Sequence, residues 1–384
     1  MSNLHAASSQ WANRPADERF WNLTDMRQAC REARANSSIA TVPFKALSVS
    51  TEGDDVTLLS RTGKASARFT NYAFGQFAAS VGAPAGYLRG LPATVVAECL
   101  NAGIKALPED ASDRSLLFHK NGGRTLRASL STSYDRVWDA DVCEMLQGLT
   151  GWQPPAGRYM GQGQSRPATT ADILPGQINI AEGDLIGPSG LYASDHDMFA
   201  FLVAPDRIIS DGAGGSLMRG IFVRNSEVGD AALSVTFFLM QAVCGNHIVW
   251  NATGVHEIRV RHLGEGTMRR AFRGFETELR RYHDASSKEE RGILAARKLV
   301  LGNTKEEVLS AILAYTKKHS IPINKSTVSE ALTVAEAHVD WYGNPRTLWA
   351  AVAGLTHASQ SSGFADTRAD TDRAAGKLLA MANA

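Results

Sequence analysis

The sequence predicts an α+β protein with a central, mostly antiparallel β-sheet and a helical C-terminal third. Residues 177–262 contain apolar or alternating runs, such as MFAFLVA, RGIFVR and HEIRVRH, separated by glycine and aspartate. Such runs are typical of strands that turn back on their neighbours. After residue 266 the apolar residues recur at steps of three and four, and helix-cap signals replace turn signals, which indicates helices.

The composition supports a folded core and excludes several classes of protein. Of 384 residues, 44% are hydrophobic and 21% are charged, which is ordinary for a soluble globular chain and excludes collagen-like, mucin-like and wholly disordered proteins. Forty Lys and Arg against 39 Asp and Glu give a net charge of +1, which excludes a polybasic coat protein. The four scattered cysteines, the absence of a signal-peptide pattern and the short apolar runs predict a cytoplasmic protein outside the membrane.

Three regions are expected along the chain. Residues 1–110 form an N-terminal α/β region, in which Leu23, Met26 and Cys30 mark a first helix and Gly53-Asp54 marks a turn between two strands. Residues 111–265 form a strand-rich core that opens with a hairpin around residues 121–123. A Pro/Gly-rich insert at 151–176 holds four prolines and five glycines, so a loop without regular elements is predicted there. Residues 266–384 form the helical C-terminal region.

Three cap signals support the helical assignment of the last region. Thr304 and Thr327 each precede a glutamate by three residues, the pattern of a capping box. Asn344 precedes a proline, the pattern of an N-cap followed by proline at the first helical position. Helices are therefore expected to begin at all three places.

The region from residue 256 to residue 301 is the most basic part of the chain. It holds eleven Lys and Arg against seven Asp and Glu, a net charge of +4. Guanidinium groups match phosphate oxygens, so these arginines are the candidate nucleic-acid contacts: Arg259, Arg261, Arg269, Arg270, Arg273, Arg280 and Arg281. The competing interpretation is a solvated helix face with intrahelical ion pairs, such as Arg273 with Glu276.

An apolar stripe runs along the same predicted helix. Its members recur at steps of four and three: Met268, Phe272, Phe275, Leu279 and Tyr282. A stripe of this kind is either core or an interface with a partner. The second possibility predicts a self-assembling accessory protein that binds a host protein.

An acidic cluster offers the rival interpretation. Asp195, His196 and Asp197 are consecutive, and Glu227 follows in the same strand-rich region. Two residues of spacing place both aspartates on one face of a strand, and carboxylates with a histidine suit Mg²⁺ or Mn²⁺, which would make the chain a divalent-metal-dependent enzyme. No second motif fixes the number of ligands. In the competing interpretation the aspartates lie in a turn or an edge strand, and the protein has no cofactor.

Several segments together resemble a known family. They are RASLSTSYDRVWD (127–139), LYASDHDMF (191–199), FVRNSEVG (222–229), VCGNHIV (243–249), RVRH (259–262) and LWAAVAGLT (348–356). The chain resembles the phage/plasmid-like family catalogued as domain of unknown function 932, whose members lie on prophages, plasmids and other mobile elements and have no established activity. The polar residues of these segments could line one groove: Ser131, Tyr134, Asp195, Asp197, Asn225, Ser226, Glu227 and Asn246.

The leading hypothesis is a noncatalytic DNA-binding protein of a mobile element. The arginines of residues 259–281 would contact phosphates, and single strands would be bound during recombination, annealing or replication. A homo-oligomer is expected because many subunits can add small phosphate contacts. The metal-dependent enzyme and the accessory protein are the alternatives.

Overall fold

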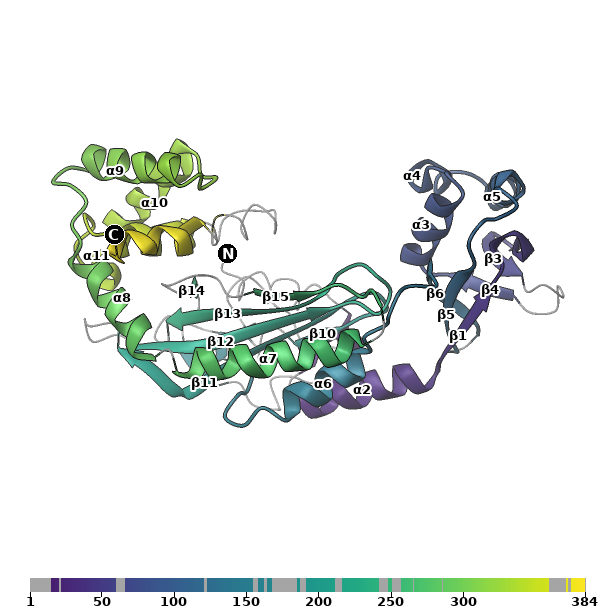
Figure 1. Ribbon diagram of the computed structural model, residues 1–384, viewed down its shortest axis with the longest axis horizontal. Coiled ribbons are helices and arrows are strands. Elements are labelled where there is room, and N and C mark those ends of the chain that lie inside the picture. Colours follow the sequence, from purple (N-terminus) through teal and green to yellow (C-terminus); the bar gives the residue numbers. More distant parts are fainter. Residues whose placement is uncertain are drawn as a thin grey trace.

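The computed structural model describes residues 15–20, 22–59, 66–120, 123–154, 158–161, 164–167, 185–186, 191–210, 216–241, 248–250, 257–264, 266–284, 286–358, 371 and 374–383. The fold is α+β, as predicted, with a helical C-terminal part. The molecule is elongated, with a small α/β lobe at one end, a long sheet in the middle and a helical lobe at the other end (Figure 1). No helix among the described residues is both long enough and apolar enough to cross a bilayer.

A six-stranded sheet forms the α/β lobe. Its spatial order is β1-β5-β6-β4-β3-β2, and its strands are β1 (Ser37–Val42), β2 (Ser48–Glu52), β3 (Asp55–Leu59), β4 (Ser66–Phe69), β5 (Arg114–His119) and β6 (Thr125–Ser131). Helices α3 (Asn71–Ser80), α4 (Ala85–Leu88) and α5 (Ala93–Ala106) complete the lobe. The predicted hairpin of β5 and β6 is present, and it pairs with β1 and β4 of the first 110 residues. The division into three regions stays a prediction.

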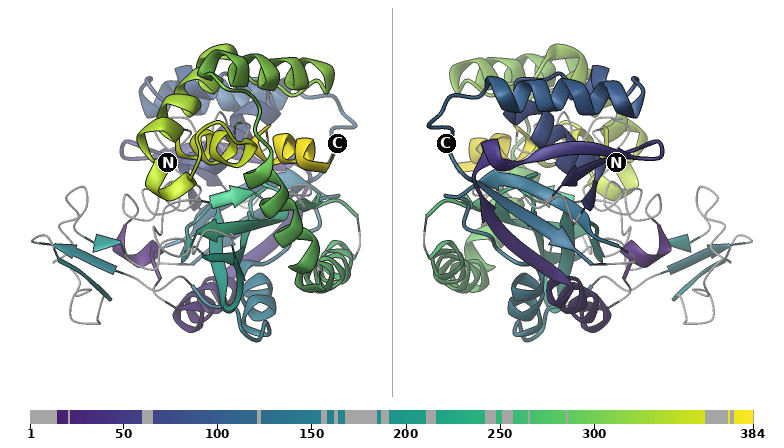
Figure 2. Two further views of the ribbon diagram at one scale, coloured as in Figure 1. Left: turned by 90° about the vertical axis from the view of Figure 1, so that its left-hand side faces the viewer. Right: turned by 90° about the vertical axis from the view of Figure 1, so that its right-hand side faces the viewer.

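The central sheet is antiparallel throughout its described strands. Its order is β10-β11-β12-β13-β14, with β15 also paired to β13. The strands are β10 (Leu191–Ala193), β11 (Met198–Ser210), β12 (Ser216–Asn225), β13 (Leu233–Gln241), β14 (Ile248–Trp250) and β15 (Glu257–Val260). Helices α2 (Leu23–Ala35), α6 (Asp139–Gln147) and α7 (Thr267–Asp284) cover its lower face (Figures 1 and 2). The upper face looks into the space between the two lobes.

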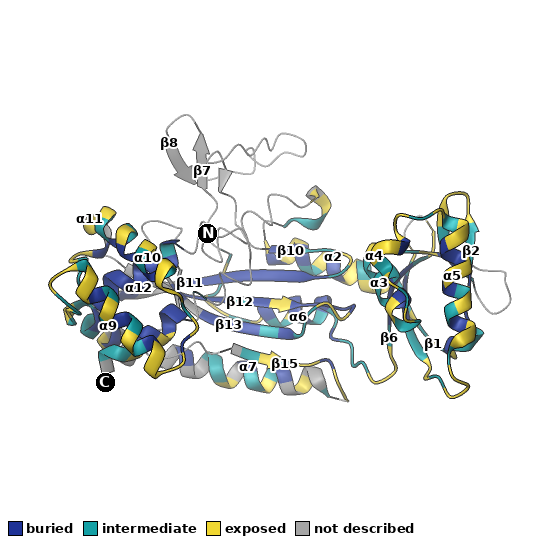
Figure 3. Cartoon of the chain, turned by 90° about the horizontal axis from the view of Figure 1, so that it is seen from above, coloured by how far each residue is buried: buried dark blue, intermediate teal, exposed yellow. Residues whose placement is uncertain are grey.

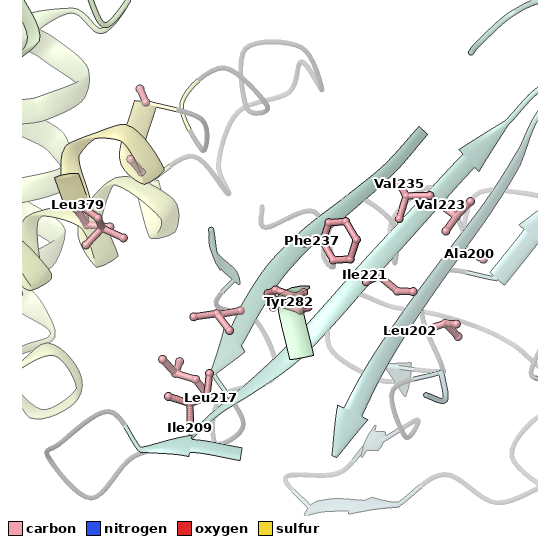
Figure 4. Close-up of a cluster of buried hydrophobic side chains, with 14 of the residues drawn as sticks. Ala200, Leu202, Ile209, Leu217, Ile221, Val223, Val235, Phe237, Tyr282 and Leu379 are labelled. Carbon is pink, nitrogen blue, oxygen red and sulfur yellow. The ribbon is translucent and has the colours of Figure 1, made fainter. Parts of the chain in front are cut away.

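The period of two along each strand builds the main core. Val223 and Ile221 alternate with outward residues on β12, and Val235 and Phe237 do the same on β13. All four side chains point to the face covered by helices (Figure 4). Tyr282 of α7 packs on Phe237 with a ring-centroid distance of 5.1 Å, so the end of α7 closes this core.

The apolar stripe of α7 is core and not a partner interface. Phe275 and Tyr282 are buried to 1% and 3% exposure, and Leu279 packs against the same cluster. Phe272 is half-buried, and the side chain of Met268 lies outside the described residues. Phe275, Leu279 and Tyr282 are therefore not available as a partner interface, and the self-assembling accessory protein stays a prediction.

The C-terminal lobe is helical, but two of its predicted helix starts are displaced. Its elements are α8 (Ser286–Lys298), α9 (Lys305–Lys318), α10 (Lys325–Ala337), α11 (Val339–Tyr342) and α12 (Leu348–Ala358), followed by a 3₁₀ turn at Leu379–Asn383. Thr304 caps α9 as predicted, by accepting from the Glu307 backbone. Asn324 caps α10 in place of Thr327. Asn344 accepts the Arg346 N–H in the turn before α12, and the Thr347 hydroxyl accepts the Ala350 N–H in the first turn of that helix.

The Pro/Gly-rich insert does contain regular structure. Strand β7 (Arg158–Gly161) pairs with β8 (Gln164–Pro167) and with β9 (Leu185–Ile186), and β7 is the middle strand. The prediction of a loop without regular elements is wrong here. Proline is tolerated because Pro167 ends an edge strand, where its missing N–H breaks no ladder.

Candidate functional site

Five buried polar side chains meet where the two sheets join, and we call them the polar junction: Arg127, Asp139, Asn225, Ser226 and Glu227, each at most 5% exposed. Arg127 projects from β6 of the first sheet. Its Nη1 donates to Glu227 Oε2 at 2.9 Å, and its Nε and Nη2 donate to the Asp195 carbonyl at 3.0 and 2.8 Å. One guanidinium therefore ties the first sheet to two turns of the central sheet.

Glu227 also receives the start of helix α6. Its Oε1 accepts the Asp139 backbone N–H at 2.9 Å, while Trp138 at the N-cap offers no side-chain cap. A carboxylate at a helix N-terminus is favoured by the unpaired N–H groups and the helix dipole. The Arg136 guanidinium donates to the Glu227 carbonyl.

Asp139 is the most deeply enclosed acid of the junction. Its Oδ1 accepts from Asn225 Nδ2 at 2.7 Å, and the same amide donates to the Val137 carbonyl at 2.9 Å. Burial, and next the neighbouring Glu227 carboxylate, hold the pKa of Asp139 well above its ordinary value. Asp139 is therefore the acid here that most favours a protonated form.

A histidine closes the junction on the side of β15. His262 Nε2 accepts the Leu233 N–H at 3.1 Å, so the ring proton is assigned to Nδ1, which faces the Tyr134 hydroxyl. The tyrosine in turn donates to the Ser226 carbonyl at 2.8 Å. Burial, followed by the nearby Arg136, lowers the pKa of His262 to about 4. The imidazole is accordingly neutral at pH 7.

The segment 194–197 is a turn between β10 and β11, so the prediction that Asp195 and Asp197 share a strand face is wrong. The Asp195 side chain is 53% exposed and accepts from His196 Nδ1 at 2.9 Å. That hydrogen bond is the main reason why the pKa of Asp195 lies below its ordinary value. The Asp197 side chain is 8% exposed, and its Oδ1 accepts from the Ser194 hydroxyl at 2.6 Å.

The expected metal ligands do not converge in the described part of the chain. Glu227 points to Arg127, away from the two aspartates, and no group of three or more His, Cys, Asp or Glu among the described residues is arranged to hold an ion. A divalent-metal enzyme stays a prediction without a geometric site.

The structure brings together most of the family-like polar residues. Tyr134, Asn225, Ser226 and Glu227 belong to one network. Asp195 joins it through its carbonyl, and Asp197 lies in the same turn as Asp195. Ser131 is exposed, and its hydroxyl bonds to the Ser133 hydroxyl and not to the network. Asn246 lies outside the described residues.

The sequence did not single out Arg127, Asp139 or His262 as site residues. Each lies inside a family-like segment, which was the available signal. Gln76 of α3 gave no signal at all, although its side chain donates to the Val228 carbonyl at 2.7 Å and accepts from the Ser129 N–H at 3.0 Å. It is a second tie between the two sheets.

Four of the seven predicted phosphate contacts have described, exposed side chains, and we call them the basic strip: Arg259 and Arg261 on and directly after β15, and Arg269 and Arg273 on α7. Strand β15 and helix α7 lie side by side (Figure 3). Ile258 faces Gly274 of α7, so the period of two turns Arg259 to the upper face. The side chains of Arg270, Arg280 and Arg281 lie outside the described residues.

The arginines of the basic strip differ from other exposed arginines. Arg31 and Arg34 each have a carboxylate oxygen within 2.6 Å. None of the four strip arginines forms an ion pair with a described residue. The strip is thus a set of four exposed guanidiniums without an ion-pair partner among the described residues.

The comparisons with known proteins give no relative: no family model, no curated protein and no solved structure matches the chain. The resemblance to the phage/plasmid-like family stays a prediction.

Proposed function

We propose that this chain is a noncatalytic DNA-binding protein of a mobile element, which binds phosphates along the basic strip. The supporting observation is the set of four exposed guanidiniums without an ion-pair partner in the described chain, on and directly after β15 and on the adjacent α7. Unpaired guanidiniums need not break an existing salt bridge before they bind a phosphate oxygen. They therefore suit a polyanion better than paired arginines do.

The proposal extends to a cytoplasmic homo-oligomer that acts in recombination or replication. Each subunit contributes one short strip, and adding strips along one DNA raises the overall affinity without any new type of contact. A single copy of the strip would bind weakly at physiological salt.

The test is fluorescence anisotropy of labelled DNA at several salt concentrations, with mass photometry of the same samples. Changing Arg259, Arg261, Arg269 and Arg273 together to Gln should weaken binding. If all four contact phosphates of a single strand, the slope of log affinity against log salt should fall by about 3, since each contact contributes about 0.7. A matched control changes four ion-paired arginines to Gln: Arg27, Arg31, Arg34 and Arg68.

The control loses the same formal charge and should keep the slope close to the wild-type slope. A strip variant that is folded and binds with the wild-type slope would remove the assignment. Wild-type protein that binds no DNA at low salt would refute the proposed function as a whole.

A further inference from the structure

A cleft of about 610 Å³ lies between helix α3 and the turn that joins β10 to β11. This volume is within the ordinary range of ligand sites. We call it the α3 cleft, and its lining is Asn71, Tyr72, Gly75, Gln76, Ala79, Arg89, Asp195 and His196. It adjoins the polar junction, since the carbonyl of its lining residue Asp195 accepts from Arg127.

The cleft contains a pair of stacked rings. The Tyr72 and His196 rings are 6.2 Å apart between centroids and 21° from parallel. The Ser226 hydroxyl donates to the His196 carbonyl at 2.6 Å, which anchors the backbone under the ring. The His196 side chain nevertheless remains 39% exposed. A planar group can therefore extend the stack without moving the backbone.

Polar groups surround the rings in an arrangement that suits a nucleotide. Arg89 donates to the Asn71 carbonyl at 2.9 Å and lies over the Phe74 ring, so its exposed guanidinium is held at the rim. The Asp195 carboxylate lies beside His196. A fixed cation suits a phosphate, and a carboxylate accepts from the exocyclic amino groups of bases.

The cleft continues onto the upper face of the central sheet. Arg224 is directly opposite Ser234, which is directly opposite Arg259 of the basic strip. Three adjacent strands span about 10 Å. On the side of the cleft, Arg224 forms an ion pair with Asp230 at 3.1 Å. Burial raises the pKa of Tyr72, the Asp230 charge raises it further and the Arg224 charge lowers it, so both charges are near the Tyr72 hydroxyl. Polar and cationic groups thus run from the strip to the cleft.

We propose that the α3 cleft holds an unpaired base of single-stranded DNA, stacked on the His196 and Tyr72 rings, while the phosphates on one side lead to the basic strip. This inference rests on the proposed function and adds a strand preference to it. A duplex cannot use the cleft, because its bases are already stacked inside the helix.

The experiment compares a labelled 20-nucleotide single strand with the same sequence as a duplex, by anisotropy at two salt concentrations. The wild type should bind the single strand more tightly. His196→Ala should weaken single-strand binding by about tenfold, the lower range for losing one stacked base, and should leave duplex binding and the salt slope unchanged. His196→Phe keeps an aromatic ring without the ring nitrogens and should retain the wild-type affinity.

The control is His319→Ala, which removes an exposed ring far along the chain in the C-terminal lobe and should change nothing. Equal wild-type affinity for single strand and duplex would overturn the inference. The inference would also be overturned if His196→Ala bound single strands as tightly as the wild type while the basic-strip variant bound them more weakly. That result would leave the proposed function in place. No DNA binding by the wild type would refute both.

Discussion

The buried histidine of the polar junction makes stability depend on pH in a defined direction. The pKa of His262 falls from its ordinary 6.5 to about 4 in the fold. Between these values the unfolded chain binds a proton that the folded chain does not. The contribution of His262 to stability is therefore fully present above about pH 6.5 and is lost as the pH falls toward 4.

The size of the effect follows from the two pKa values. Between about pH 7 and pH 5, the free energy of unfolding should fall by about 2 kcal/mol through this group. His262→Gln should remove that dependence, because an amide can accept from the Leu233 N–H and donate to Tyr134 without titrating. Urea unfolding at several pH values between 5 and 7 measures the slope and avoids the range in which most carboxylates titrate.

The readout is the slope of the free energy of unfolding against pH. An amide that fits less well lowers stability at every pH and does not change this slope. His319→Gln is the matched control, because His319 is exposed, and it should keep the wild-type slope. If His262→Gln loses as much stability as the wild type between pH 7 and pH 5, a buried neutral His262 is not the cause.

Three further changes test the packing and the junction. Arg127→Met leaves the buried Glu227 carboxylate without its guanidinium and should lower the free energy of unfolding by about 3–5 kcal/mol. Adding Glu227→Gln to this variant should restore more than half of the lost stability. An Arg127→Met variant as stable as the wild type would contradict the pairing. Gly354→Ala places a methyl carbon 2.1 Å from a carbonyl oxygen of α10 and should lower the free energy of unfolding by about 1–3 kcal/mol or more in the same assay. The control is Gly86→Ala, whose methyl group meets nothing within 4 Å and should leave stability unchanged. Because the pKa of Asp139 is raised, its contribution to stability is fully present below the ordinary carboxyl pKa and is lost as the pH rises through the raised value. Asp139→Asn should flatten this loss of stability with rising pH in the same assay, and an unchanged or steeper loss would exclude a protonated Asp139.

The sequence predicts the α+β class because local periodicity is strong in the elements that define it. Leu23, Met26 and Cys30 recur at helical steps, and all three are buried in α2. The alternation in HEIRVRH separates the inward Ile258 from the exposed Arg259. These signals depend on neighbours in the chain, so no tertiary information is needed.

The polar junction could not be derived in this way. Arg127 and Glu227 are 100 positions apart, and a charged residue within a strand is ordinarily interpreted as solvent-facing. Only the packing of the two sheets, which brings β6 against the turn after β12, makes that arginine a buried partner. The family-like segments include Arg127 and Glu227, but the sequence does not show that these two side chains contact each other.

The misplaced helix starts have a local cause. Asn324 and Thr327 are both good capping residues within one turn, and the structure uses the first, whose Oδ1 accepts from the Thr327 N–H at 2.8 Å and from its hydroxyl at 2.9 Å. Propensity alone does not choose between two caps three residues apart. The preceding chain path decides which one has the extended backbone that a cap requires.

The position of helix α2 has a consequence for synthesis on the ribosome. Its apolar face, with Met26 fully buried, packs in the same core as strand β13, which ends at Gln241. About 200 residues separate the two, and at roughly 5–20 residues per second the ribosome needs roughly 10–40 s to translate them. During that interval the helix has no finished sheet to cover its apolar side. The apolar side of the helix therefore stays without its final partner until β13 has been made, and slow translation between residues 35 and 241 would prolong that exposure.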